Sequence, residues 1–157
     1  MRVGLGFDIH RFSSGRKLVL GGVEVAFEQG LAGHSDADVL VHAIIDAMLG
    51  AAGLGDIGEY FPPGEAKYKD ISSTLLLERV KELIGEKGYC IHNLDCVIMA
   101  EVPHLSPYKA KIKANLAKHL GIEENMINIK ATTTEGLGFI GRKEGIAAQA
   151  VCLIEAI

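Results

Sequence analysis

The chain has 157 residues, of which 48% are hydrophobic, and it carries a formal net charge of −4 with an isoelectric point near 5.8. This composition predicts one compact domain over residues 1–157. It offers no basic patch of the kind that binds nucleic acid. No apolar run reaches the roughly 20 residues that a bilayer span requires. The three cysteines lack metal-type spacing and stand among apolar neighbours. We therefore expect buried, reduced thiols in a soluble, unprocessed chain with a cytoplasmic location.

The first residues alternate between apolar and small or polar types, which predicts a strand over residues 2–12. Asp8 and His10 lie on one face of this strand, about 6.6 Å apart at a rise of about 3.3 Å per residue, so both can reach one ion. Two polar residues on an exposed strand face are the alternative. Gly4 and Gly6 share that face, and their missing side chains leave room for a ligand or a neighbouring element.

Alternation and capping signals predict the remaining elements in chain order. They are a hairpin over residues 17–27, a helix from residue 36 or 38 to residue 49, a loop over 53–64, a helix over 72–86, a strand over 89–100, a helix over 106–121, and strands over 126–131 and 145–154. The last strand is apolar at nearly every position, so both of its faces should be buried. From α+β and α/β we choose α+β: a single domain, mainly one four-stranded sheet with helices packed on one face.

The helix that begins near residue 38 is apolar almost all the way round, except for one stripe. Asp38, His42 and Asp46 follow one another at four-residue intervals, so they line one narrow helix face. A solvated stripe is the alternative, although such stripes normally carry paired long side chains of opposite charge. Ser35 or Asp36 is the expected N-cap.

Asp8, His10 and His42 together provide two imidazoles and one carboxylate. Three protein ligands leave the fourth position of a tetrahedral zinc ion open, which is typical of catalytic sites. Such a site keeps a net charge of about +1 and would attract a phosphoryl oxygen. Iron is the competing ion for this ligand set.

Two further polar runs are candidates for anion binding. His34 and Ser35 precede the helix and lie at its expected N-terminus, where anions bind readily, although Ser35 could simply cap the helix. Residues 130–138 offer consecutive hydroxyls, a carboxylate and glycines at the end of a strand. A threonine-rich strand end followed by a glycine turn is the alternative for the second run.

Three motifs resemble the 2-C-methyl-D-erythritol 2,4-cyclodiphosphate synthase family, and the resemblance extends over the whole chain. The motifs are GLGFDIHRF, GHSDADVLVHAIIDAMLGAAGLGDIGEYFP and KATTTEGLGFIGRKEGIAAQA. The resemblance implies a phosphorus-oxygen lyase of the non-mevalonate isoprenoid route. It would convert 4-diphosphocytidyl-2-C-methyl-D-erythritol 2-phosphate to the 2,4-cyclodiphosphate by metal-assisted intramolecular attack of the 2-phosphate on the β-phosphate, with release of CMP.

The resemblance also implies roles for individual residues. One Zn²⁺ per active site would bind to Asp8, His10 and His42. The catalytic residues would be His34 and Thr133, as transition-state stabilisers, and Glu135, as ligand of Mg²⁺ or Mn²⁺ on the substrate diphosphate. The implied substrate-binding residues are Asp8, His10, His34, Ser35, Asp56, Ile57, Gly58, Phe61, Ala100, Glu101, Val102, Pro103, His104, Leu105, Ser106, Ala131, Thr132, Thr133, Thr134, Glu135, Phe139 and Arg142.

Family members are homotrimers with active sites between subunits, and Phe139 and Arg142 match a pocket for an isoprenoid diphosphate at the trimer axis. Two positions depart from the family pattern: His104 stands where lysine is frequent, and Gln149 where some members have glutamate. From the residues alone, a zinc hydrolase of phosphodiesters and a non-catalytic, metal-stabilised module remain alternatives.

Overall fold

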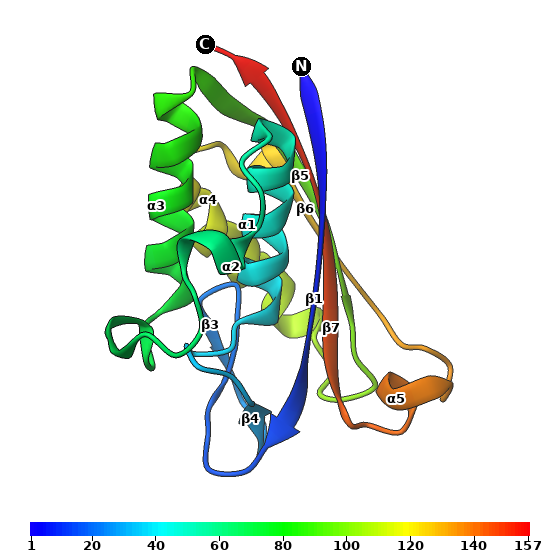
Figure 1. Cartoon of the computed structure of the whole chain (residues 1–157). Helices are drawn as coiled ribbons and strands as arrows, with labels where there is room; N and C mark the ends of the chain where they lie inside the picture. Colours follow the sequence, from blue (N-terminus) through cyan, green and yellow to red (C-terminus); the bar gives the residue numbers. More distant parts are fainter.

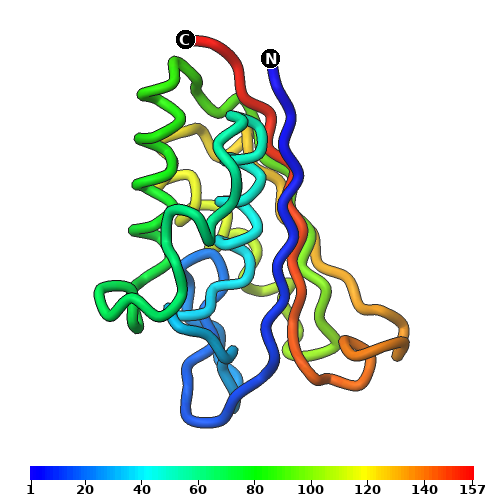
Figure 2. The backbone as a smooth tube through the Cα atoms, viewed as in Figure 1, coloured from blue at the N-terminus to red at the C-terminus, as the bar shows by residue number.

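A five-stranded mixed sheet with helices on one of its faces makes up the computed structural model, which describes residues 1–157 (Figure 1). The strand order is β4-β1-β7-β5-β6, and only the β5–β6 pair is parallel. The strands are β1 (Arg2–Ser13), β4 (Gly30–Leu31), β5 (Tyr89–Met99), β6 (Ile127–Thr132) and β7 (Gly145–Ala156), with β2 (Leu18–Leu20) and β3 (Val23–Val25) in a separate hairpin. Because β1 and β7 are neighbours, the two chain ends lie close together (Figure 2).

Three long helices cover the sheet on the same side (Figure 1). They are α1 (Val39–Ala52), α3 (Ser73–Glu86) and α4 (Lys109–Leu120). Two one-turn helices, α2 (Ile57–Tyr60) and α5 (Gly138–Gly141), and three 3₁₀ turns, Ala66–Tyr68, Ser106–Tyr108 and Glu124–Met126, complete the chain. The α+β class and the one-sided helix layer agree with the sequence analysis. None of the helices combines the length and the apolar character needed to cross a bilayer.

The expectation of a four-stranded sheet is wrong by one strand. Gly30–Leu31 pairs with Phe12 and Ser13 at the end of β1 and forms the extra edge strand β4. A two-residue strand has no alternation that a sequence could reveal, because its pairing depends only on the distant end of β1. The region 53–64, expected to be a loop, likewise contains the single turn α2.

Helix α1 lies directly against the backbone of β1. A Cβ atom on Gly4 would stand 1.9 Å from the carbonyl oxygen of Ala47, and one on Gly6 would stand 1.9 Å from that of Ala43. These glycines therefore make room for the helix backbone, not for a ligand. The close approach brings the next residue on the same strand face, Asp8, to the side of α1.

The N-cap of α1 is Asp38, and not Ser35 or Asp36 as expected. Its carboxylate accepts hydrogen bonds from the backbone N–H of Val41 at 3.1 Å, Gly21 at 2.9 Å and Gly22 at 2.6 Å. Asp38 is fully buried, and burial, together with the charge of Asp36, raises its pKa to about 6 although the three N–H groups oppose this. The carboxylate thus ties the start of α1 to the β2–β3 turn.

The opposite face of the sheet carries none of the three long helices and has a row of exposed apolar side chains. Val3, Leu5 and Phe7 on β1 are 67%, 61% and 52% exposed, and Val151 on β7 is 39% exposed. The prediction that both faces of the last strand are buried is therefore wrong for the single chain, because the helices cover only one of them.

The cysteines are all unpaired, and two of the three are buried as expected. Burial raises the pKa of the Cys96 and Cys152 thiols to about 12. Cys90 is exposed, against the expectation, because it lies near the start of β5.

Replacing Gly6 with alanine should lower the free energy of unfolding by about 3 kcal/mol, because the new methyl group would meet the carbonyl of Ala43. The control is Gly50→Ala within α1, where an added Cβ meets nothing within 4 Å; it should raise stability by up to about 1 kcal/mol. Chemical denaturation measures both variants. Equal stabilities would contradict the close approach of α1 to β1.

Candidate active site

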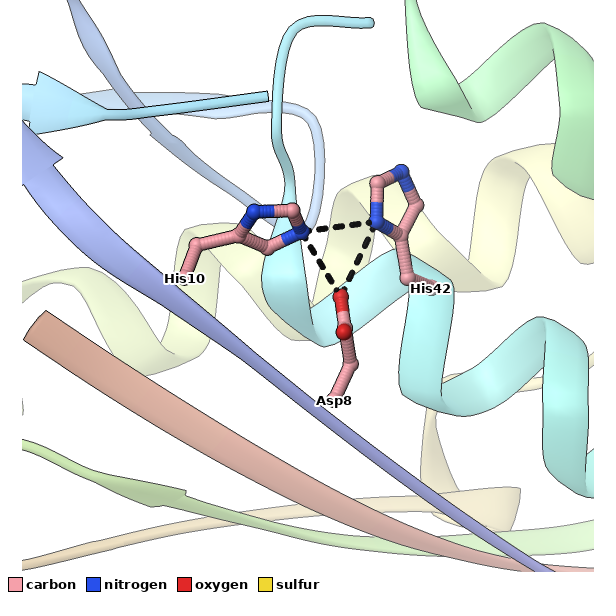
Figure 3. A group of neighbouring side chains, drawn as sticks. All are labelled: Asp8, His10 and His42. Atoms are coloured by element: carbon pink, nitrogen blue, oxygen red, sulfur yellow. Dashed lines mark hydrogen bonds and ion pairs between the residues drawn. The ribbon is translucent and has the colours of Figure 1, made fainter. Parts of the chain in front are cut away.

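Asp8, His10 and His42 meet where α1 crosses β1 (Figure 3). Asp8 Oδ2 lies 2.9 Å from His10 Nε2 and 3.0 Å from His42 Nδ1, and the two ring nitrogens are 3.2 Å apart. The side chains of Asp8, His10 and His42 are 27%, 19% and 13% exposed, so the cluster is only partly open to solvent. The second nitrogen of each ring points away from the centre, as Figure 3 shows.

The surroundings of His10 assign its proton. The carbonyl oxygen of Ala32 can only accept, so His10 Nδ1, 2.6 Å away, donates to it. In a neutral ring the lone pair is then on Nε2, which faces the carboxylate oxygen of Asp8. Two acceptor atoms 2.9 Å apart repel each other unless a proton or a metal ion lies between them.

The electrostatics of the cluster favour positive charge at its centre. Burial opposes ionisation of Asp8, but hydrogen bonds and charges from His10 and His42 outweigh it and lower the pKa of Asp8 to about 2. Burial also opposes protonation of His10, yet the Asp8 carboxylate raises the pKa of His10. The donor set therefore fits a divalent cation: one carboxylate oxygen and two imidazole nitrogens that lie within 4.8 Å of one another.

A cavity of about 280 Å³ opens beside the cluster. Its lining residues are Asp8, His10, His34, Ser35, His42, Asp46, Ile57, Gly58, Phe61, Pro63, Tyr68 and Leu76. Eight of these stand in the ligand and substrate sets given by the sequence analysis. The lining combines the polar groups of the cluster with the aromatic side chains of Phe61 and Tyr68, as in a site for a small polar ligand.

Two contacts shape the rim of this cavity. His34 Nε2 donates to the carbonyl of Glu65 at 2.9 Å, so its proton position is fixed. Asp46 Oδ1 accepts the backbone N–H of Ile57 at 2.8 Å, which holds the turn at residues 56–58 against α1. Asp56 caps α2 through the N–H of Glu59 and does not line the cavity.

A second hollow, of about 440 Å³, lies between the ends of β5 and β6. Its lining residues are Ala100, Glu101, Val102, Pro103, His104, Leu105, Ser106, Ala131, Thr132 and Thr133. It shares no residue with the cavity beside Asp8, His10 and His42. Figure 1 shows α5, which follows β6, on the other side of the sheet from α2. One chain therefore separates the predicted site residues into two groups.

Glu101 organises the loop that follows β6. Its Oε1 accepts the backbone N–H of Thr134 at 2.9 Å, that of Gly136 at 3.2 Å and the Thr134 hydroxyl at 3.3 Å. These bonds, led by the two backbone N–H groups, lower the pKa of Glu101. The bonded residues, Thr134 and Gly136, lie on either side of Glu135. Glu135 has a φ of 54°, which is unusual for a residue with a side chain, and its carboxylate is exposed to solvent.

The remaining predicted residues lie beyond both hollows or at their edge. Phe139 in α5 is 45% exposed and lines another depression, of about 280 Å³, with Ile9 and His10. Arg142 Nε donates to Glu144 at 2.6 Å. Gln149 lies on β7 opposite Phe7, on the open face of the sheet.

Sequence reasoning missed several residues of the first cavity. Asp46 was singled out only as part of the helical stripe, and that stripe is the signal that could have assigned it to the site. Tyr68 lines the cavity, and Ser73 lies beside His42 without lining it; both come from the segment after α2, where nothing in the sequence indicates proximity to His42. Their positions depend on how this segment folds back over α1.

The comparisons with known proteins agree with one another. The model of the YgbB family matches residues 1–155. The 2-C-methyl-D-erythritol 2,4-cyclodiphosphate synthase of Clostridium acetobutylicum is 59% identical over 154 residues, which cover 98% of this chain and 99% of the relative.

Two solved structures show the same fold. The IspF–CDP complex of Plasmodium falciparum has a TM-score of 0.87 at 37% identity. The match covers 99% of this chain and 96% of the Plasmodium chain. The bifunctional IspDF of Campylobacter jejuni has a TM-score of 0.96 at 45% identity. That match includes 99% of this chain but only 42% of the longer bifunctional one.

Glu101→Ala should speed hydrogen exchange of the Thr134 and Gly136 amides by about tenfold, because both N–H groups lose their acceptor. Glu101→Gln should leave these rates nearly unchanged, since all three bonds end on one oxygen and an amide oxygen can replace it. Exchange measured by NMR distinguishes the variants. If both exchange like the unaltered protein, Glu101 does not hold the loop.

Proposed function

The chain belongs to the YgbB family, and from this premise we propose how its side chains carry out the reaction that its relatives' name describes. It is a lyase of isoprenoid biosynthesis that converts 4-diphosphocytidyl-2-C-methyl-D-erythritol 2-phosphate to 2-C-methyl-D-erythritol 2,4-cyclodiphosphate and CMP. The observation that supports this assignment best is the convergence of Asp8, His10 and His42 on one point at the wall of an open cavity.

The cluster of Asp8, His10 and His42 is proposed to hold Zn²⁺, and Glu135 to hold Mg²⁺ or Mn²⁺ together with the substrate diphosphate. When bound, these ions supply positive charge to phosphoryl oxygens of the reacting groups. The exposed carboxylate of Glu135 is a suitable ligand for a hard cation. No side chain has to act as a nucleophile, because the attacking 2-phosphate belongs to the substrate.

The protein's own contribution is to position two anionic groups that repel each other. The 2-phosphate oxygen forms a bond to the β-phosphorus while the bond from that phosphorus to the CMP oxygen breaks. His34, at the rim of the first cavity, and Thr133, at the second hollow, are proposed to stabilise the transition state by hydrogen bonds. Holding the two phosphates side by side in the cavity that Phe61 lines would favour the intramolecular attack over attack by water.

The substrate would be divided between the two hollows. We assign the erythritol phosphate to the cavity beside Asp8, with the backbone of residues 56–58 and Ser35 as contacts. The cytidine would occupy the second hollow, whose backbone groups at residues 100–106 and 131–134 can read the base. His104 is exposed at that hollow and replaces a frequent lysine, so the base contact relies on backbone and not on this side chain.

Because one chain separates these hollows, each complete site is proposed to lie between two subunits of a homotrimer. The bare sheet face supports this assembly, since its exposed row of Val3, Leu5, Phe7 and Val151 is an apolar surface of the kind that mediates protein contacts. Phe139 and Arg142 near this face are proposed ligands of an isoprenoid diphosphate at the trimer axis. Gln149 on β7 would contribute no charge there.

Incubating the purified protein with the cytidylated substrate, Zn²⁺ and Mg²⁺ should release one equivalent of CMP for each cyclic diphosphate formed. Phosphorus NMR identifies both products. A linear phosphate in place of the cyclic one would instead support the zinc hydrolase, in which water is the nucleophile. Absence of CMP would overturn the assignment.

His42→Ala should abolish stoichiometric zinc binding and lower turnover by about 10³-fold or more, because two ligands cannot keep the ion in place. The fold should persist, since His42 lies at the cavity wall. The control is His119→Ala, which removes an imidazole paired with Glu78 at 2.7 Å far from the cluster. Zinc analysis and circular dichroism compare the variants, and one retained zinc per chain in His42→Ala would refute the ligand assignment.

A further inference from the structure

Behind His42, on the side away from Asp8 and His10, lies a buried hydroxyl group. Ser73 is the first residue of α3 and has no exposed surface. Its Oγ lies 2.9 Å from His42 Nε2. The carboxylate of Asp36 accepts the Ser73 hydroxyl proton on Oδ1 and the Ser73 backbone N–H on Oδ2, the latter at 2.9 Å. Carboxylate, hydroxyl and imidazole therefore form one continuous chain of hydrogen bonds.

The direction of this chain follows from what each group can donate. A carboxylate only accepts, so the single proton of the Ser73 hydroxyl points to Asp36. The lone pairs of Ser73 Oγ then face His42, and the bond at 2.9 Å forms only if Nε2 carries a proton. In a neutral imidazole the other nitrogen, Nδ1, is consequently unprotonated. Nδ1 is the atom that lies 3.0 Å from Asp8 Oδ2.

A second hydroxyl agrees with this assignment. Ser35 Oγ lies 3.2 Å from the same Nε2 and already accepts the backbone N–H of Ala37 at 3.2 Å. It can share the Nε2 proton with Ser73 and direct its own proton to Ser73 Oγ, 3.4 Å away. No buried polar side-chain atom in the chain is left without a partner, so the network is satisfied in this arrangement.

We propose that Asp36 and Ser73 are positioning residues that fix the tautomer and the ring orientation of His42, so that Nδ1 is free to bind the metal. The inference rests on the proposed metal site. It assigns that site two outer partners: Ser73, which stands in none of the three motifs, and Asp36, which stands in the second motif; neither lines the cavity. Outer hydrogen-bond partners of this kind raise the basicity of an imidazole ligand, and losing them commonly weakens metal binding by about 10–100-fold.

The first test is Ser73→Ala, with zinc affinity measured by competition against a chromophoric chelator. Affinity should fall by about tenfold or more, with one zinc per chain still bound at saturation. The matched control is Ser72→Ala, which removes a neighbouring hydroxyl bonded only to Thr74 Oγ1 at 2.8 Å and should leave the affinity unchanged.

Asp36→Asn provides an independent test if Ser73→Ala does not fold. The amide group can donate to Ser73 Oγ and turn the hydroxyl proton toward His42 Nε2, which favours the tautomer that cannot bind through Nδ1. Nitrogen-15 NMR of the zinc-loaded, unaltered protein should show a slowly exchanging proton on His42 Nε2. In both variants this proton should be absent or exchange rapidly.

Zinc affinities within about twofold of the unaltered protein in both variants would overturn the inference, even if their thermal stability were lower. That result would leave Asp36 and Ser73 with only a structural role at the start of α3. Failure of the unaltered protein to bind one zinc per chain is a different result. It would refute the metal site itself, and the inference with it.

Discussion

The close approach of α1 to β1 is the constraint on which the rest of the structure depends. Only glycine at positions 4 and 6 lets the helix backbone lie against the strand, since a single methyl group would meet a carbonyl oxygen at either place. Asp8 and His10 lie further along the same face of β1. His42 lies closer to the N-terminus of α1 than the alanines that face these glycines. The site thus forms where strand and helix are already held together, and no mobile loop carries these three side chains.

The cluster is poised for a cation before any ligand enters. Asp8 Oδ2 and His10 Nε2 face each other at 2.9 Å, although the bond from His10 to Ala32 leaves no proton on the facing nitrogen of a neutral ring. A proton relieves the repulsion in part, which explains the raised pKa of His10. A divalent ion held by these three residues would relieve it further. It would also supply, at the cavity wall, the local positive charge that an acidic protein needs to hold phosphates.

Much of the fold and of the candidate site could be predicted from the sequence, because the patterns that indicate them lie within single strands and helices. Alternation identified the face of β1 that carries Asp8 and His10, and the four-residue spacing identified the stripe with His42. The N-cap was assigned wrongly because Asp38 bonds to the distant Gly21 and Gly22 as well as to its own helix. The two-residue strand β4 and the buried Ser73 depend wholly on contacts far along the chain, and such contacts leave no periodic pattern.

The pleat of β1 couples the metal cluster to the bare face of the sheet. Successive side chains of a strand point to opposite faces, so Asp8 and His10 alternate with Phe7 and Ile9, which are 52% and 38% exposed. A shift of one residue in the β1–β7 register would exchange the two sets and destroy both surfaces. If subunits meet on the apolar face, the β1–β7 register keeps Phe7 and Ile9 on that face. The same register then also keeps Asp8 and His10 on the face that carries α1. Assembly and metal binding then share one structural requirement, and the ten paired positions from Arg2–Ile154 to Arg11–Gly145 enforce it.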